Sequence, residues 1–522
     1  MSPPLHYSRG LSRLVVALGI SLSALGCAGH SSRTEGARDA LDANRPKQAL
    51  ALLNEELEVD SAKQQPDDLS GDNALLLLDR SMVLQQLGKY SLSSADLQAA
   101  DKAVDLLDLS RGTADDIGKY LFSDDTGPYK APPYEKLLIN TMNMVNYLVR
   151  HDLNGARVEA RRLAVMQQYL KEHEGQGAAL TGPGSYLAGF TFEKSGRADE
   201  ALRYYDEALQ YGNYKSLYPV VRRVAAEGSY RSPRIRKILE TAPQTYNGAP
   251  PRQDDRQPRP VPSPYFAVEV DQGAKPDSPP PQDPDQSTSS QDVDAGEQAD
   301  AGAKPETALR PETPLKKLPK PTEILVVINY GRVPAKVAKR IPIGLALTWA
   351  AGHMGPGQEA QANRLAAQGL VTWINYPALG KARGQYEVPE FSIDGEPAPL
   401  EAAIGIDLEA RAAWKDAEGA VIGAAITRMI SRVVAGEVAR TAAGRDNIWG
   451  ILLSLGTQAT LTAVDTPDTR SWALLPARMA IGRRVVRPGV HHVTLGARGN
   501  YKAAKLTLKE GGWAVLNLTV LN

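Results

Sequence analysis

The stretch from Pro243 to Pro321 constrains the fold most, because its composition does not suit a packed core. It is rich in Pro, Asp, Gln, Ser and Gly and has few large apolar side chains. Such a stretch buries too little apolar surface to offset the conformational entropy that ordering removes. We therefore predict a disordered linker over residues 243–321, which tethers one folded part of the chain to another.

The part before the linker, residues 31–242, is expected to be an all-α domain. Charged residues, Ala and Leu recur there with helical spacing, and Gly, Asn or Asp separates short helix pairs. A chain of 522 residues has room for two or three domains. A separate helical domain therefore fits the length.

The clearest helix pair lies between Tyr186 and Ala208 and resembles a tetratricopeptide repeat. Its packing residues are Gly189, Phe192, Gly196, Ala201, Tyr205 and Ala208. Small residues let two helices approach closely, and the two aromatic rings fill the space between them. A plain helical bundle has the same apolar stripes and is the alternative.

A second copy of the pattern has its turn at Gly88, followed by Tyr90. Weaker copies have turns at residues 44–46 and 152–155. The spacing between copies is uneven, so we expect loops or extra helices to interrupt the array. The sequence thus predicts a tetratricopeptide-like helical repeat domain.

The part after the linker, residues 322–522, returns to β-type patterns. Strands are expected at residues 324–329, 370–375, 490–495, 504–508 and 513–521, and helices at 417–442 and 447–463. Short turns that contain Gly join the last strands. We predict an α+β domain with an antiparallel β-sandwich and two helices.

Residues 1–26 have the layout of a signal peptide. A basic region precedes an apolar stretch that ends at Cys27, the only cysteine of the chain, and this stretch is too short to cross a bilayer as a helix. Residues 24–27 resemble a bacterial lipobox, which implies that Cys27 carries a lipid. Ala28 then implies an outer-membrane position that faces the periplasm. The alternative is a secreted protein with an incidental cysteine.

The residues offer little for catalysis. Equal numbers of acidic and basic residues give no electrostatic basis for nucleic-acid binding. The glycines of residues 352–357 lack the Lys and Ser/Thr of a nucleotide-binding loop, and His491 and His492 are neighbours on a strand, so they point to opposite faces and cannot share a metal. We expect no catalytic residue, metal, nucleotide or cofactor.

One cluster has the residue types of a binding site. It consists of Asp468, Arg470, Trp472 and Pro476. Arg and Trp are enriched in binding hot spots, because they supply much contact for each ordered torsion. The alternative is that Asp468 and Arg470 pair within a loop while Trp472 fills the sandwich.

Together with the lipobox and the helix pairs, residues 331–342 and 468–476 resemble a poorly characterised family of bacterial lipoproteins. In that family a tetratricopeptide-like half precedes a mainly β half. The resemblance implies an interaction scaffold in the cell envelope, linked to peptidoglycan synthesis or envelope assembly, with envelope proteins and peptidoglycan as partners. Two alternatives remain. One is a hydrolase of peptidoglycan or polysaccharide with its site in the C-terminal domain, where the candidate acids are Asp394 with Glu401 or Asp465 with Asp468. The other is a structural part of an export or surface-assembly complex.

Overall fold

The computed structural model describes residues 29–70, 72–109, 129, 131–173, 178–241, 267–270, 320–367, 373–442 and 467–522. The predicted signal peptide, Cys27, the predicted helix at 447–463, Asp465 and most of the predicted linker lie outside these residues. Those predictions stay predictions.

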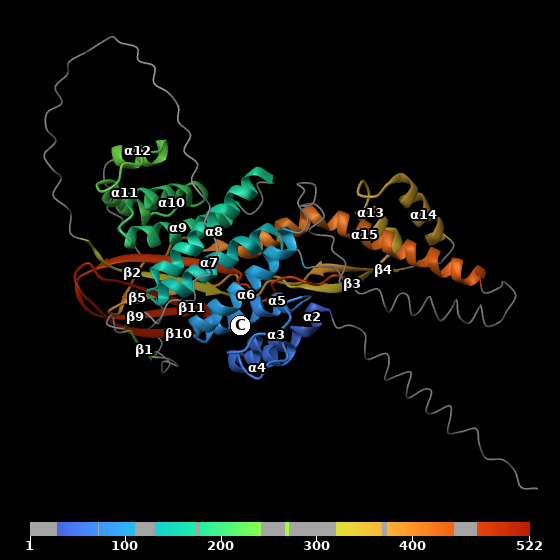
Figure 1. The fold of residues 1–522 in the computed structure, drawn as a ribbon, viewed down its shortest axis with the longest axis horizontal. Coiled ribbons are helices and arrows are strands. Elements are labelled where there is room, and N and C mark those ends of the chain that lie inside the picture. The colour runs from blue at the N-terminus through green and yellow to red at the C-terminus, as the bar shows by residue number, and fades with distance from the viewer. Residues whose placement is uncertain are drawn as a thin grey trace, which may run out of the picture.

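The helical half runs from α2 to α12 (Figure 1). Its elements are α2 (His30–Arg33), α3 (Glu35–Asp42), α4 (Pro46–Glu56), α5 (Asn73–Gln86), α6 (Tyr90–Leu109), α7 (Pro133–Val149), α8 (Leu153–His173), α9 (Ala178–Lys194), α10 (Ala198–Tyr211), α11 (Leu217–Ala225) and α12 (Pro233–Glu240). Helices that follow one another along the chain pack side by side from α3 to α11.

Five of the turns between these helices have the same backbone geometry. The residues with positive φ, between 55° and 74°, are Asn44, Glu58, Gly88, His151 and Gly196. At the last of them, the N–H of Gly196 donates to the carbonyl of Glu193 at 3.0 Å, and the next N–H reaches the carbonyl of Phe192 at 2.9 Å. The other four turns repeat both hydrogen bonds, which are those of a Schellman motif. These helix ends therefore share one turn geometry.

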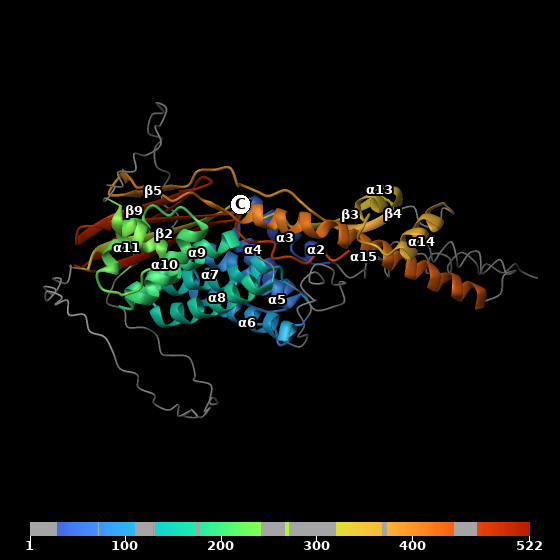
Figure 2. The ribbon, with the colours of Figure 1, turned by 90° about the horizontal axis from the view of Figure 1, so that it is seen from above.

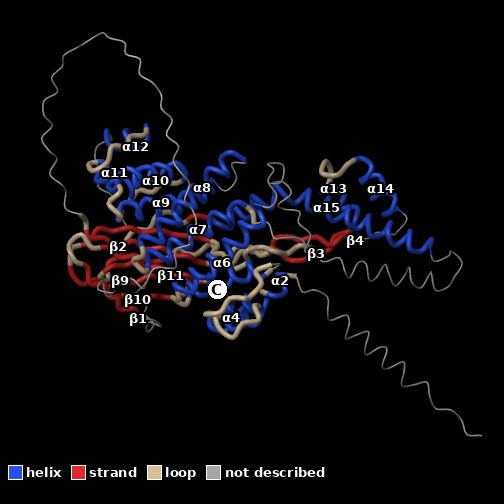
Figure 3. The backbone as a smooth tube through the Cα atoms, in the orientation of Figure 1, coloured by secondary structure: helices blue, strands red, loops and turns tan. Residues whose placement is uncertain are grey.

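The C-terminal half contains two main sheets (Figure 3). One has the strand order β11 (Trp513–Val520), β2 (Thr322–Tyr330), β8 (Arg478–Val486) and β7 (Ile404–Gly405). The other has the order β1 (Ala267–Val270), β10 (Asn500–Leu508), β9 (Gly489–Ala497), β5 (Glu390–Ile393) and β6 (Glu396–Pro397). A helical part followed by an α+β part was expected and is confirmed.

The prediction that the sandwich is antiparallel is wrong for two pairings. β11 runs parallel to β2, and β1 runs parallel to β10. The short turn after Leu508 suggests a hairpin, but the chain crosses there to the other sheet, where β11 joins β2. β1 lies inside the predicted linker, so these four residues differ from the prediction of disorder.

β2 lies at the centre of three layers. Ile324, Val326 and Ile328 face the second sheet, whereas Leu325 and Val327 face the helices, and all five are fully buried. Figure 2 shows the helices of the N-terminal half on one side of the strands. The hydrophobic core that contains Leu325 also contains residues of α3 to α12, so one core joins the two halves.

A further unit, in addition to the helical half and the two main sheets, extends from the sheets (Figure 2). β3 (Lys336–Pro342) and β4 (Trp373–Leu379) form a hairpin that packs with α13 (Ile343–Trp349), α14 (Pro356–Ala367) and α15 (Ile406–Ala442). The helix expected at 417–442 is the later part of α15, which has 37 residues. No helix among the described residues is long and apolar enough to cross a bilayer.

Candidate functional site: a polar interface and a cationic groove

The predicted binding cluster lies at the boundary between the two halves and is buried. The guanidinium of Arg470 donates twice to the carboxylate of Asp468 at 2.9 Å, and it lies 5.8 Å above the ring of Tyr129. The side chains of Arg470 and Trp472 are fully buried, and Pro476 is buried too. The ion pair is internal, as in the alternative interpretation, but the indole lies in the core between the helices and the sheet and not inside the sandwich.

Two carboxylates of the helical half hold this segment in place. Glu135 accepts the backbone N–H of Trp472 at 3.1 Å and the hydroxyl of Tyr129 at 2.6 Å. Burial raises the pKa of Glu135 although these hydrogen bonds act to lower it. Asp79 accepts the backbone N–H of Leu474 at 2.7 Å. The sequence contains no local signal for either contact, because each joins residues hundreds of positions apart.

Asp79 also contacts the first described residues of the chain. Its other carboxylate oxygen lies 3.1 Å from Nε2 of His30, which is fully buried. The next residue, Ser31, donates its N–H to the hydroxyl of Thr469 at 3.3 Å. These contacts join residues 30 and 31 to a carboxylate of the helical half and to the C-terminal half.

A larger ion cluster lies where α9 meets the sheet. Arg483 of β8 donates to Glu323 at 2.6 Å, to the hydroxyl of Tyr205 at 2.9 Å and to both oxygens of Glu193 at 2.9 Å. Lys194 pairs with Glu193 and Glu323. The buried charges are thus matched by opposite charges, as burial requires.

Burial and charge act against each other in this cluster. Burial acts to raise the pKa of Glu193, but the charges of Arg483, Lys194 and Arg223 outweigh it and hold this pKa below its usual value. Burial lowers the pKa of Lys194 to about 7, against the raising effect of Glu193. A cavity of about 190 Å³ borders Lys194, but its amine is already held by two carboxylates.

The predicted repeat residues come together on α9 and α10. A Cβ on Gly189 would lie 2.4 Å from the ring of Tyr205, so only glycine permits this approach. Phe192 stacks on Tyr204 with ring centroids 5.2 Å apart, and Ala201 and Ala208 are fully buried. The pair is as closely packed as the sequence predicts.

The second predicted copy differs in one respect. Gly88 adopts φ 72° at its turn, as a turn glycine should. Tyr90, however, reaches across to the sheet, where its hydroxyl donates to the carbonyl of Asn517 at 3.2 Å and accepts from Lys502 at 3.0 Å. Its role is to join the two halves.

Asp394 and Glu401, candidate acids of the hydrolase alternative, have structural contacts. Asp394 accepts the N–H of His492 at 2.8 Å and lies 2.7 Å from Nδ1 of His491. Glu401 accepts the N–H groups of Lys215 and Ser216, at the start of α11, at 3.2 and 2.7 Å. The carboxylate of Asp394 thus stabilises the β8–β9 turn, and that of Glu401 stabilises the start of α11.

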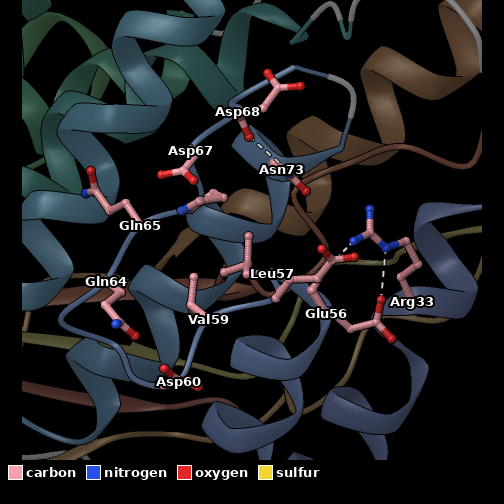
Figure 4. A pocket seen from close by; sticks show the side chains of 12 residues that line it. Arg33, Glu56, Leu57, Val59, Asp60, Gln64, Gln65, Asp67, Asp68 and Asn73 are labelled. Carbon is pink, nitrogen blue, oxygen red and sulfur yellow. Dashed lines mark hydrogen bonds and ion pairs between the residues drawn. The ribbon is translucent and has the colours of Figure 1, made fainter.

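An acidic cavity of about 510 Å³ lies between α4 and α5 (Figure 4). Its lining includes Arg33, Glu56, Glu58, Asp60, Asp67 and Asp68. Arg33 pairs with Glu56 at 2.9 Å, and Figure 4 shows Asp67 and Asp68 on the other side of the cavity. In the described part of the chain, no three His, Cys, Asp or Glu residues are placed to hold a metal ion.

A second cavity, of about 530 Å³, is the best candidate for a binding site, and we call it the α10–α12 groove. It is lined by Leu209, Gln210, Gly212, Asn213, Tyr218, Pro219, Arg222, Arg234, Lys237, Ile238 and Thr241. All of these belong to the end of the helical half, and the C-terminal half contributes none. The groove combines apolar side chains with three cations, which no sequence pattern had indicated.

Comparisons of the chain with models of protein families, with curated proteins and with solved structures found no match.

Proposed function

We propose that the protein is a lipid-anchored lipoprotein of the outer membrane that faces the periplasm and acts as an interaction scaffold of the cell envelope. In this proposal Cys27 carries the lipid, the helical half is a tetratricopeptide-like array, and residues 243–321, apart from β1, are a disordered linker. The chain would be a member of the lipoprotein family that its motifs resemble. Its partners would be envelope proteins, in peptidoglycan synthesis or envelope assembly.

The helical array supports the repeat part of the proposal. Five turns share one hydrogen-bond pattern, and Gly189 lets α9 and α10 approach so closely that a Cβ there would meet the ring of Tyr205. Stacked helix pairs present an extended surface, and such arrays use it for binding. The end of this array carries the α10–α12 groove, and this is the observation on which the scaffold proposal depends most.

The burial of His30 is consistent with a membrane anchor at Cys27. Only Ala28 and Gly29 separate this histidine from the cysteine. An extended chain spans about 3.5 Å per residue, so a lipid on Cys27 would hold the folded body within roughly 10 Å of the bilayer surface. Several acyl chains, at about 0.8 kcal/mol per buried methylene, would make this attachment stable.

The hydrolase alternative has less support. A glycosidase needs two carboxyl groups that face one glycosidic bond. Asp394 and Glu401 are each occupied by backbone N–H groups. No described cavity brings these two acids together.

The proposal can be tested by crosslinking in intact cells with the full-length chain. A photoreactive residue at Tyr218, in the groove, should capture an envelope protein, whereas one at Tyr386, which is 89% exposed but outside the groove, should not. A Cys27→Ser variant should leave the membrane fraction. Equal labelling at both positions would contradict the scaffold, and a Cys27→Ser variant that stays with the membranes would contradict the anchor.

A further inference from the structure

We infer that the α10–α12 groove binds an extended acidic segment of a partner protein, which places an apolar side chain against Tyr218. The inference rests on the proposed scaffold function and names the chemistry of the partner. It is carried by the charges and shape of the groove.

The lining of the groove has one sign of charge. Arg222, Arg234 and Lys237 line it, and no acidic residue does. Arg234 pairs with Asp206 at 2.6 Å, so its charge is balanced. Arg222 is held by the backbone carbonyls of Leu239 and Thr241, which carry no net charge. The charges of Arg222 and Lys237 therefore leave a positive potential, which attracts carboxylates.

The apolar side chains of the groove indicate a second feature of the occupant. Tyr218 is 39% exposed, and Leu209, Pro219 and Ile238 lie beside it in the lining. An aromatic side chain held open in a groove is typical of a binding hot spot. A ligand with only charged groups would leave this apolar surface hydrated. A ligand that carries an apolar side chain between acidic ones would cover it and therefore fits the groove better.

The size and position of the groove favour a peptide. About 530 Å³ is within the range of pockets that enclose a ligand of several side chains. The groove lies at the end of the series of packed helices, and its lining comes from α10, α11, α12 and the residues next to them. Thr241 lines the groove, and the chain that follows is rich in Asp over residues 271–300, so this segment is the competing occupant that a test must separate.

The test uses the full-length protein in detergent and a fluorescent probe peptide, Asp-Asp-Leu-Trp-Asp-Asp with blocked ends. Fluorescence anisotropy should show saturable binding that weakens with salt. A peptide with Lys in place of every Asp should not bind, and one with Ser in place of Leu and Trp should bind at least about tenfold more weakly.

Two neighbouring residues of α12 provide a matched pair of variants. Lys237 lines the groove, whereas Arg236 is exposed on the same helix and does not. Lys237→Glu should weaken the acidic probe at least about tenfold, and Arg236→Glu should change it less than about twofold. Tyr218→Ser should weaken the probe as well. Unchanged melting temperatures will show that the variants are folded.

Several results would overturn the inference. These are no saturable binding of the acidic probe, equal binding of the Lys peptide, or equal losses in Lys237→Glu and Arg236→Glu. A variant without residues 271–300 that binds the probe at least about tenfold more tightly would show that the chain fills its own groove. Crosslinking from Tyr218 still tests the scaffold function separately, because a partner of different chemistry would be captured there.

Discussion

His491 lies at the corner where the chain passes from β8 in one sheet to β9 in the other. Its Nε2 lies 2.7 Å from the carbonyl of Arg487, and its Nδ1 lies 2.7 Å from a carboxylate oxygen of Asp394. Both ring nitrogens thus face acceptors, which only the imidazolium can satisfy. Burial lowers the pKa of His491, but these two acceptors outweigh it and raise the pKa above 6.5.

The corner should be most stable in mildly acidic solution. The raised pKa of His491 gives stability that is present below pH 6.5 and is lost as the pH rises through the folded value. The N–H of His492 is the main cause that lowers the pKa of Asp394 from 3.8. The stability that the Asp394 carboxylate contributes is therefore lost as the pH falls through its pKa in the folded protein. Asp394→Asn should therefore lower the melting temperature more at about pH 5.5 than at about pH 8.5. Because the side chain of Asp394 is 46% exposed, we expect the substitution to lower the free energy of unfolding by less than about 1 kcal/mol. Equal losses of melting temperature at both pH values would contradict this account.

The α9–α10 pair is the element that the sequence predicted best, because the relevant residues are close together along the chain. Gly189, Gly196 and Tyr205 lie within one helix pair, and local spacing is enough to place them. The contact of Tyr90 with the sheet and the parallel pairing of β11 were missed. Each depends on residues that are distant in sequence, for which a single chain gives no periodic signal.

The closeness of this helix pair leads to a prediction. Tyr205 cannot move away from a new methyl group on Gly189, because its hydroxyl is held by Glu193 at 2.6 Å and by Arg483 at 2.9 Å. Gly189→Ala should therefore destabilise the protein by about 1–3 kcal/mol in urea unfolding, although Ala favours helices by about 1 kcal/mol.

Gly344 of α13 is the matched control, since a Cβ there meets no atom within 4 Å. Gly344→Ala should leave the free energy of unfolding unchanged or raise it by up to about 1 kcal/mol. Similar effects of the two substitutions would show that the contact between Gly189 and Tyr205 does not limit the packing.

At the scale of the whole molecule, the two halves behave as one body in the structure. Composition divided the chain at the linker and correctly separated a helical part from an α+β part. It gave no reason to expect that β2 would be buried between the helices and the second sheet, or that Arg483 would reach Glu193 and Tyr205. Trp472 of the predicted binding cluster lies in this shared core, and its position there depends on contacts with the distant helical half.

The shared core predicts the result of cutting the chain between its halves. A protease site inserted between residues 271 and 319 should be cleaved without separating the two pieces. They should elute together in gel filtration and unfold in a single thermal transition, as expected for one cooperative unit. Two separate peaks, or two transitions in calorimetry, would show that the interface is weaker than its buried contacts indicate.

The contacts of His30 also affect when the protein can finish folding. This imidazole is buried beside Asp79, which also binds the backbone of Leu474, and Ser31 contacts Thr469. A ribosome synthesises residue 30 long before residue 474. The contacts of the first helices with residues 469 and 474 therefore cannot form until the C-terminal half has been synthesised. Pairings between such distant residues form slowly. The helix faces that contact the C-terminal half therefore stay uncovered until that half is present, and we expect folding to depend on factors that shield unfolded chains.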